Sequence, residues 1–225
     1  MVEPRLELIN TPAWPIKELL AQEKTALGYY FSGHPYKAYK DDMAGIVDRA
    51  LSQVAPQTRP QLMAGVIMDV RIQMGKKGKM AFVQLDDGTA RLDVAVYPEQ
   101  FETYRNLLKA DNLLVIFGKV SHDDYSGGLR VVADEIYGLD QARNRFANRL
   151  NIRINEQTSV DGLRRMLMPY QAEGSGCPVC LHYQTVARMC EIHLGSVWRV
   201  RLEDTLMHEL RECLGPENVG IQYGQ

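Results

Sequence analysis

An alternation of apolar and polar residues that begins near Gln61 constrains this chain more than any other feature. Every second residue from Leu62 to Ile72 is apolar, which is typical of a β-strand that buries one face. Further strands are expected over 80–85, 90–97, 113–121 and 129–139, with an Asp-Gly hairpin turn at 86–88 and a helix from Pro98 to about Lys109. The segment 61–138 therefore predicts three strands, a helix and two further strands.

This order of elements is that of an OB-fold, a small five-stranded Greek-key barrel. In such a barrel, the outer face of strands 2 and 3 and the loops 1–2 and 4–5 bind oligonucleotides. We therefore predict an OB-fold nucleic-acid-binding domain over 61–138. The order of the strands supports the fold; binding has to be argued from particular side chains.

The flanking segments make the predicted fold class mixed: short N-terminal helices, the barrel, then a small α/β (α+β) domain. Residues 1–60 are expected to form a helical connector, with one helix from Ile16 that stops near Gly28 and a second over 36–50. An Arg-rich linker helix is expected over 139–150. In the C-terminal domain, 151–225, we expect strands near 150–154, 177–183, 186–194, 197–202 and 219–223, and helices over 160–170 and 204–214.

Composition excludes several classes of protein. The chain has 26 basic and 28 acidic side chains, so it does not coat nucleic acid by bulk charge, although a local basic patch is allowed. No apolar run reaches the roughly 18–20 residues that cross a bilayer, and residues 1–12 do not resemble a secretory signal. We therefore expect a cytoplasmic protein whose four cysteines remain thiols.

Four runs of residues resemble one protein family. They are EKTALGYYFSGHP at 23–35, AFVQLDDG at 81–88, GKVSHDDYSGG at 118–128 and WRV at 198–200. Together they are similar to the C-terminal region of the bacterial replicative DNA polymerase III alpha subunit, over about residues 14–225. In that family the end of the fingers and helix-hairpin-helix region is followed by an OB domain and then by a domain that binds the tau subunit of the clamp loader.

The resemblance implies a non-catalytic fragment of a DNA-directed DNA polymerase. The family's catalytic carboxylates lie in a palm domain upstream, and the chain shows no set of carboxylates suited to two-metal phosphoryl transfer. We therefore expect no catalytic residue and no cofactor in this fragment, with Mg²⁺ needed by the parent polymerase. The expected partners are single-stranded DNA, tau and the remainder of the polymerase holoenzyme, associated with the nucleoid and not with a membrane.

Four cations and no acid lie between residues 70 and 80, in the predicted loop 74–79 and just before it. Such a loop flanks the binding groove of an OB-fold, so backbone phosphates are its natural partner, although a solvated hairpin has the same composition. If Ala81, Val83 and Leu85 fill the barrel, then Phe82 faces outward, where a base can stack; the opposite register would bury it. We favour the outward register, because three aliphatic side chains suit the inside of a tight barrel. The candidate DNA-binding residues are Arg71, Lys76, Lys77, Lys79, Phe82, Arg91 and Tyr97.

A second candidate surface lies near the C-terminus. Aromatic anchors concentrate binding energy, and leucines recur at helical spacing in 204–214. The candidate partner-binding residues are Trp198, Arg199, Leu206, Leu210 and Leu214. The alternative is that the same residues form the core of the domain.

Three other motifs have simpler explanations. Cys177 and Cys180 would face opposite sides of a strand, so we expect no metal there, although His182, Cys190 and His193 are nearby. The Asp123-Asp124 pair fits turn chemistry, and Ser32-Gly33-His34 lacks a third group that would orient a catalytic base.

Three alternative functions stay open. A free-standing RNA-binding module is possible, because anticodon-binding domains of some aminoacyl-tRNA synthetases use a similar barrel. A zinc-binding or redox protein is another. The third is the same region of an error-prone alpha-like polymerase, whose members tend to lack the tail seen at 151–225.

Overall fold

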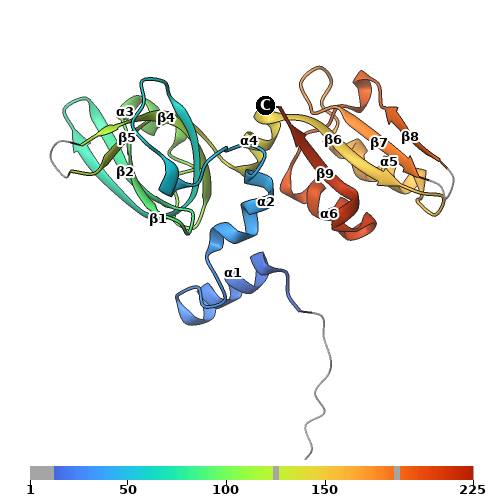
Figure 1. Ribbon diagram of the computed structural model, residues 1–225, viewed down its shortest axis with the longest axis horizontal. Coiled ribbons are helices and arrows are strands. Elements are labelled where there is room, and N and C mark those ends of the chain that lie inside the picture. The colour runs from blue at the N-terminus through green and yellow to red at the C-terminus, as the bar shows by residue number, and fades with distance from the viewer. Residues whose placement is uncertain (1–12, 124–126, 185–187, 225) are drawn as a thin grey trace, which may run out of the picture.

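The computed structural model describes residues 13–123, 127–184 and 188–224. It has two lobes, a barrel and a flat sheet with helices, joined by α4 and flanked by the N-terminal helices (Figure 1). The helices are α1 Ile16–Leu27, α2 Lys40–Met43, α3 Pro98–Tyr104, α4 Leu139–Phe146, α5 Val160–Leu167 and α6 Asp204–Leu214, with 3-10 turns at Pro35–Tyr39, Leu51–Gln53, Met168–Tyr170, Ser196–Trp198 and Pro216–Asn218. The strands are β1 Gln61–Gly75, β2 Gly78–Asp86, β3 Arg91–Val96, β4 Leu113–His122, β5 Leu129–Tyr137, β6 Ala147–Ile154, β7 Val179–Gln184, β8 Met189–His193 and β9 Val219–Tyr223.

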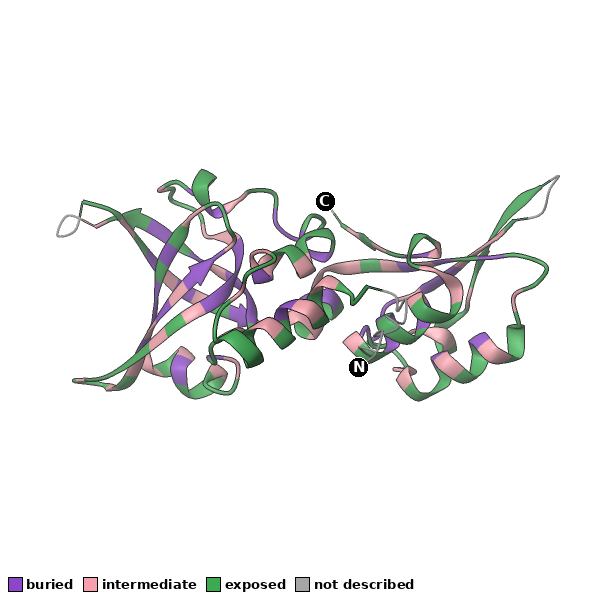
Figure 2. Cartoon of the chain, turned by 90° about the horizontal axis from the view of Figure 1, so that it is seen from below, coloured by how far each residue is buried: buried purple, intermediate pink, exposed green. Residues whose placement is uncertain are grey.

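The predicted five-stranded barrel is confirmed. Its strands close in the order β1-β2-β3-β5-β4, and β3 and β5 are the parallel pair that completes the circle. The long β1 pairs with β4 through its first half and with β2 through its second. Figure 2 shows buried residues along the strands of this lobe.

The burial pattern of β1 differs from the simple alternation expected from the sequence. In its first half both faces are buried: Met63 and Ile67 fill the barrel, while Ala64 and Val66 pack outside it against the connector and α4. A register shift between Ile67 and Asp69 then moves Val70 to the barrel side. Ile72, which we expected in the core, pairs with the buried Ala81 but is 59% exposed, because the hairpin arm of β1 and β2 extends beyond the barrel.

The connector is fixed to the barrel by the run 23–35. The Glu23 carboxylate accepts hydrogen bonds from the backbone N–H of Phe31 and of Ser32 and from the Ser32 hydroxyl, and these bonds lower the pKa of Glu23. The His34 Nε2 lies 3.1 Å from the buried Asp86 carboxylate at the end of β2. Ser32 and His34 therefore have structural partners, which agrees with the turn predicted for this motif.

The first helix ends as predicted, since Gly28 adopts φ 81° directly after Leu27. The second predicted helix, 36–50, was wrong: only Pro35–Met43 is helical, as a 3-10 turn followed by the short α2. The chain packs tightly just beyond α2, at Gly45, where an added Cβ would lie 2.2 Å from the Tyr223 ring. The helix expected from Pro98 to Lys109 likewise ends at Tyr104.

The C-terminal lobe is a four-stranded sheet in the order β8-β7-β6-β9. The helices α5 and α6 cover one face, and their apolar side chains share a core with Leu150, Ile152 and Val179. The strand β6 begins at Ala147, so the linker helix is shorter than the predicted 139–150 and the sheet starts earlier than residue 151.

Three predictions in this lobe need correction. The helix expected over 160–170 changes to a 3-10 turn at Met168, because Pro169 has no N–H to donate to the helix. The strand expected over 197–202 is a 3-10 turn followed by isolated bridges from Val200 to Gln171 and Cys177. The strand expected over 186–194 is β8, which runs from Met189 to His193, and residues 185–187 lie outside the described part of the chain. In the barrel lobe, residues 124–126 also lie outside it, and they include Asp124 of the predicted turn.

The two lobes are joined by an ion network centred on α4. Arg143, which is only 1% exposed, donates from Nη2 to Asp42 Oδ2 at 2.7 Å and from Nη1 to Asp204 Oδ1 at 3.0 Å. Lys17 of α1 also contacts Asp204. The Arg143 guanidinium of the linker helix α4 thus binds both the N-terminal connector, through Asp42, and the C-terminal lobe, through Asp204. Among the described residues, no helix combines the length and the apolar character needed to cross a bilayer.

Candidate nucleic-acid interface

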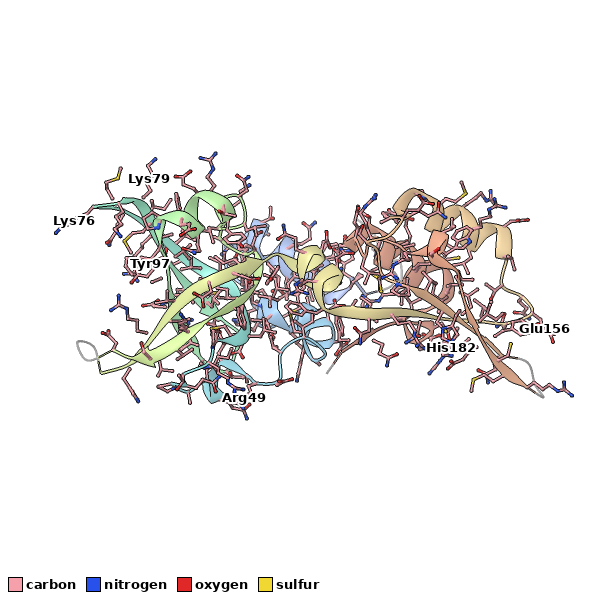
Figure 3. All side chains as sticks on the ribbon, turned by 90° about the horizontal axis from the view of Figure 1, so that it is seen from above. Arg49, Lys76, Lys79, Tyr97, Glu156 and His182 are labelled. Atoms are coloured by element: carbon pink, nitrogen blue, oxygen red, sulfur yellow. The ribbon has the colours of Figure 1, made fainter. Side chains whose placement is uncertain are left out.

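A basic hairpin projects from one end of the barrel. The strands β1 and β2 remain paired as far as Gly75 and Gly78, so Lys76 and Lys77 alone form the turn, and the predicted loop 74–79 is shorter than expected. Gly78 has φ 128°, a conformation that side chains other than glycine rarely adopt. Lys76, Lys77 and Lys79 are all exposed. Figure 3 shows Lys76 and Lys79 at the outer edge of this lobe.

Phe82 lies on the outer face of β2, in the register that the sequence favoured. Its neighbours Ala81 and Val83 are fully buried in the barrel, whereas Phe82 is partly exposed. Its cross-strand partners are Arg71 of β1 and Ala95 of β3. An aromatic ring between a guanidinium and a small side chain offers a flat platform on which a base can stack, worth about 1–3 kcal/mol per base.

Tyr97 follows the last residue of β3 and lines the same cavity as the hairpin. Its hydroxyl accepts a hydrogen bond from the Arg130 guanidinium at 2.8 Å. A cavity of about 850 Å³ lies between Tyr97 and the hairpin; it is lined by Lys77, Gly78, Lys79, Tyr97, Pro98, Glu99, Gln100 and Glu102. The lining has both signs of charge, so it can accept a phosphate on the lysine side while the tyrosine ring contacts a base.

Arg71 carries a charge that is partly compensated. Its guanidinium lies 3.7 Å from the Asp69 carboxylate and 3.6 Å from that of Asp93, and its side chain is 59% exposed. Exposed pairs of this length contribute little and are weakened by salt. A phosphate can therefore compete for Arg71. Asp69 and Asp93 thus lie at the end of the basic region that begins at the hairpin and includes Arg71.

Arg91 is the predicted site residue that the structure separates from the others. It lies at the opposite end of β3 from Tyr97, six residues or about 20 Å along the strand. Its Nε donates to the buried Asp86 carboxylate at 2.7 Å. The remaining six candidates, Arg71, Lys76, Lys77, Lys79, Phe82 and Tyr97, lie on the hairpin half of the barrel.

Sequence reasoning missed three residues on this half. Ile72 and Met74 are 59% and 75% exposed, because the hairpin arm continues beyond the barrel they would otherwise fill. Apolar side chains on such an arm can contact bases. Arg130 of the neighbouring strand β5 donates to the Tyr97 hydroxyl. The sequence pattern does not reveal these positions, since they depend on how far the hairpin arm extends beyond the barrel and on the pairing of β3 with β5.

The proposed partner stripe in the C-terminal lobe needs correction. Leu206 and Leu210 are fully buried, and Leu214 is partly buried against the same core, because this side of α6 packs on the sheet. Trp198 also packs against that core, and Arg199 donates from Nε to the Gly176 carbonyl at 2.7 Å. The alternative interpretation, in which these residues stabilise the domain, is the one the structure favours.

Comparison with known proteins adds an independent line of evidence. A family model described as an OB-fold nucleic acid binding domain matches residues 62–139. A second model, described as the C-terminal domain of DNA polymerase III subunit alpha, matches residues 162–215. DNA polymerase III subunit alpha of Neisseria meningitidis serogroup B is 35% identical over an alignment of 225 residues, and the alignment covers 99% of this chain and 20% of that protein. The chain is homologous to a segment of DNA polymerase III subunit alpha.

Other DNA polymerase III alpha subunits give the same result. That of Escherichia coli K12 is 32% identical over 216 residues, covering 93% of this chain and 19% of the relative. The chain thus spans about a fifth of the length of the curated alpha subunits it matches. Among solved structures, the second OB-fold domain of replication protein A from Methanococcus maripaludis is similar at 18% identity, with a TM-score of 0.33, over 40% of this chain and 92% of that one.

Proposed function

We propose that the barrel of this chain binds single-stranded template DNA as an accessory, non-catalytic part of a replicative DNA polymerase III alpha subunit. The observation that carries the proposal is the position of the lysine hairpin, Phe82 and Tyr97 on one half of an OB barrel. Lysines at the rim suit phosphates, and aromatic rings on the face suit bases. The match of the C-terminal domain model to 162–215 favours the replicative subunit over an error-prone relative.

Charge reversal of the hairpin tests the phosphate contacts. Changing Lys76, Lys77 and Lys79 together to Glu should weaken binding of an unpaired oligonucleotide. The slope of log affinity against log salt should also flatten, by up to about 0.7 for each phosphate that the protein no longer neutralises. The matched control is Arg164→Glu with Arg165→Glu, two exposed arginines on α5 in the other lobe. Unchanged affinity and slope in the triple variant would remove the hairpin from the interface.

Substitution of the aromatic ring tests base stacking separately from charge. Phe82→Ala should cost about 1–3 kcal/mol per stacked base, whereas Phe82→Trp should retain affinity. The salt slope should stay the same in both variants, because neither changes a phosphate contact. A competition between DNA and RNA oligonucleotides of the same sequence separates a template-binding barrel from an RNA-binding module.

The C-terminal lobe is proposed to dock the polymerase to the tau subunit of the clamp loader. The support for this step is the match of residues 162–215 to the model of the C-terminal domain of alpha. A pull-down with tau should recover the full chain and lose it when residues 151–225 are removed. Oligonucleotide binding by the shortened chain is the control that its barrel still folds, and retention of tau by residues 1–150 would contradict the docking role.

Chemistry is proposed to occur elsewhere in a longer subunit. DNA binding by the barrel and docking by the tail require no cofactor, and Mg²⁺ is expected to act only in the catalytic part. We infer from this template-binding role that the protein acts at the nucleoid, in the cytoplasm.

A further inference from the structure

The face of the C-terminal sheet opposite α5 and α6 carries a cluster of cysteine, glutamate and histidine side chains, of which Cys180 is buried and Glu191 and His193 are exposed. We propose that Cys180, Glu191 and His193 form a site for a zinc-like divalent transition metal, with His182 beside it. This site goes beyond the proposed DNA-binding function, because it lies in the other lobe. Figure 3 labels His182 on that lobe, far from Lys76 and Tyr97.

Strand register brings these residues to one face. Along β7, Val179 and Leu181 point to the core shared with the helices, so Cys180 and His182 point to the opposite face. Across the antiparallel pair, Cys180 is opposite His193 and His182 is opposite Glu191. Four donor groups thus form a two-by-two block on adjacent strands.

The donor atoms are already close together. One ligand atom each from Cys180, Glu191 and His193 lies within 4.8 Å of the others. The Glu191 carboxylate lies 3.6 Å from His193 Nε2 and 3.6 Å from His182 Nδ1. Zinc bonds of about 2.0–2.3 Å place tetrahedral ligands about 3.5 Å apart. The donor atoms would therefore have to move closer to one another by about an ångström to bind zinc. The side chains of Glu191 and His193 are exposed and can rotate by that amount.

The donor set has the chemistry of a zinc site. Thiolate, imidazole and carboxylate are the three protein ligands of Zn²⁺, and two anionic ligands neutralise a divalent cation. His182 Nε2 lies 3.2 Å from the Asn151 side-chain oxygen. This contact orients the ring with Nδ1 toward Glu191, as an outer hydrogen bond does for a metal-bound histidine. His182 or a water molecule would supply the fourth ligand.

This site differs from the Cys177–Cys180 pair weighed in the sequence. Cys177 belongs to the apolar core, so only Cys180 faces the cluster. The rival explanation is a set of ordinary cross-strand ion pairs between Glu191 and the two histidines. That explanation requires no thiolate, and it predicts no metal affinity.

Titration of the full chain with Zn²⁺ against a chromophoric chelator, and with Co²⁺ by absorption, tests the proposal. We expect one metal ion per chain, with a thiolate-to-cobalt charge-transfer band. Glu191→Gln and His193→Ala change exposed residues and should fold, and each should weaken Zn²⁺ binding at least about tenfold. Cys180→Ser should abolish the charge-transfer band. The matched control is Cys190→Ser, which changes an exposed cysteine on the opposite face of β8 and should leave both readouts unchanged.

The proposal is overturned by absence of the charge-transfer band in the wild-type chain. It is also overturned if Glu191→Gln and His193→Ala bind Zn²⁺ as tightly as the wild type, or if Cys190→Ser removes the band. Circular dichroism of each variant confirms that the fold is kept. Oligonucleotide binding by the barrel is a separate readout, so failure of the metal site and failure of the proposed function are distinguishable.

Discussion

Replacing Arg143 with methionine should destabilise the junction between the lobes. Burial alone would lower the pKa of this guanidinium, but Asp42 and Asp204 outweigh it and the net effect raises the pKa, so Arg143 stays charged. The methionine fills similar space and removes the charge. Asp42, only 9% exposed, then loses its 2.7 Å partner.

The size of the effect follows from what remains around Asp42. Breaking a buried ion pair costs about 3–5 kcal/mol, because one charge is left without a partner. Arg211 Nη2 lies 3.6 Å from Asp42 Oδ1 and still compensates part of that charge, which favours the lower end, about 3 kcal/mol. The contact to Asp204 adds little, since that side chain is 44% exposed.

Urea unfolding followed by circular dichroism measures the free energy of unfolding of each variant. The double variant Arg143→Met with Asp42→Leu should recover much of the loss, since no unpaired charge is left buried. If Arg143→Met lies within about 0.5 kcal/mol of the wild type, the usual range for surface substitutions, then Asp42 does not depend on Arg143 for its stabilisation. The same conclusion follows if the double variant is no more stable than Arg143→Met.

Three further predictions concern individual side chains. Gly118→Ala should destabilise the barrel by about 1–3 kcal/mol in urea unfolding, because the new Cβ would lie 2.4 Å from a backbone carbonyl oxygen of β5. The control is Gly220→Ala, which should be nearly neutral because its new Cβ meets nothing within 4 Å. Burial would raise the pKa of Asp87, but hydrogen bonds from Leu51, Thr89 and Ala90 outweigh it and lower the pKa. The contribution of Asp87 to the free energy of unfolding is present above the ordinary pKa of 3.8 and is lost as the pH falls through the lower pKa of the folded state. Asp87→Asn should therefore reduce the loss of stability that urea unfolding measures as the pH is lowered. Burial raises the pKa of Cys177 to about 11, so an alkylating reagent should modify the exposed Cys190 and Cys213 in the folded protein and reach Cys177 only on unfolding; rapid modification of Cys177 would contradict its place in the core.

The sequence predicted those elements whose pattern is local. The amphipathic helices 16–27 and 204–214 and the strand order of the barrel follow from apolar spacing, Gly28 and the Gly215-Pro216 pair. The outward position of Phe82 followed from the volume of its neighbours. These signals are carried by residues next to one another in the chain.

The failures come from contacts between distant segments. The residues Ala64 and Val66 are buried outside the barrel because the connector and α4 cover them, which no alternation within β1 reveals. The leucines of α6 form a stripe that is compatible with either a core or a partner, and the decision depends on where the sheet lies. The metal-binding cluster likewise depends on the pairing of β7 with β8.

Amide chemical-shift mapping of the full chain with a single-stranded DNA oligonucleotide tests whether the hairpin half of the barrel binds DNA. Perturbed amides should gather on that half, over 71–82 and around Tyr97, and the shifts of the C-terminal sheet should stay unchanged. Perturbations centred on β6–β9, or on the Arg91 end of the barrel with none at the lysine hairpin, would contradict DNA binding by the hairpin half.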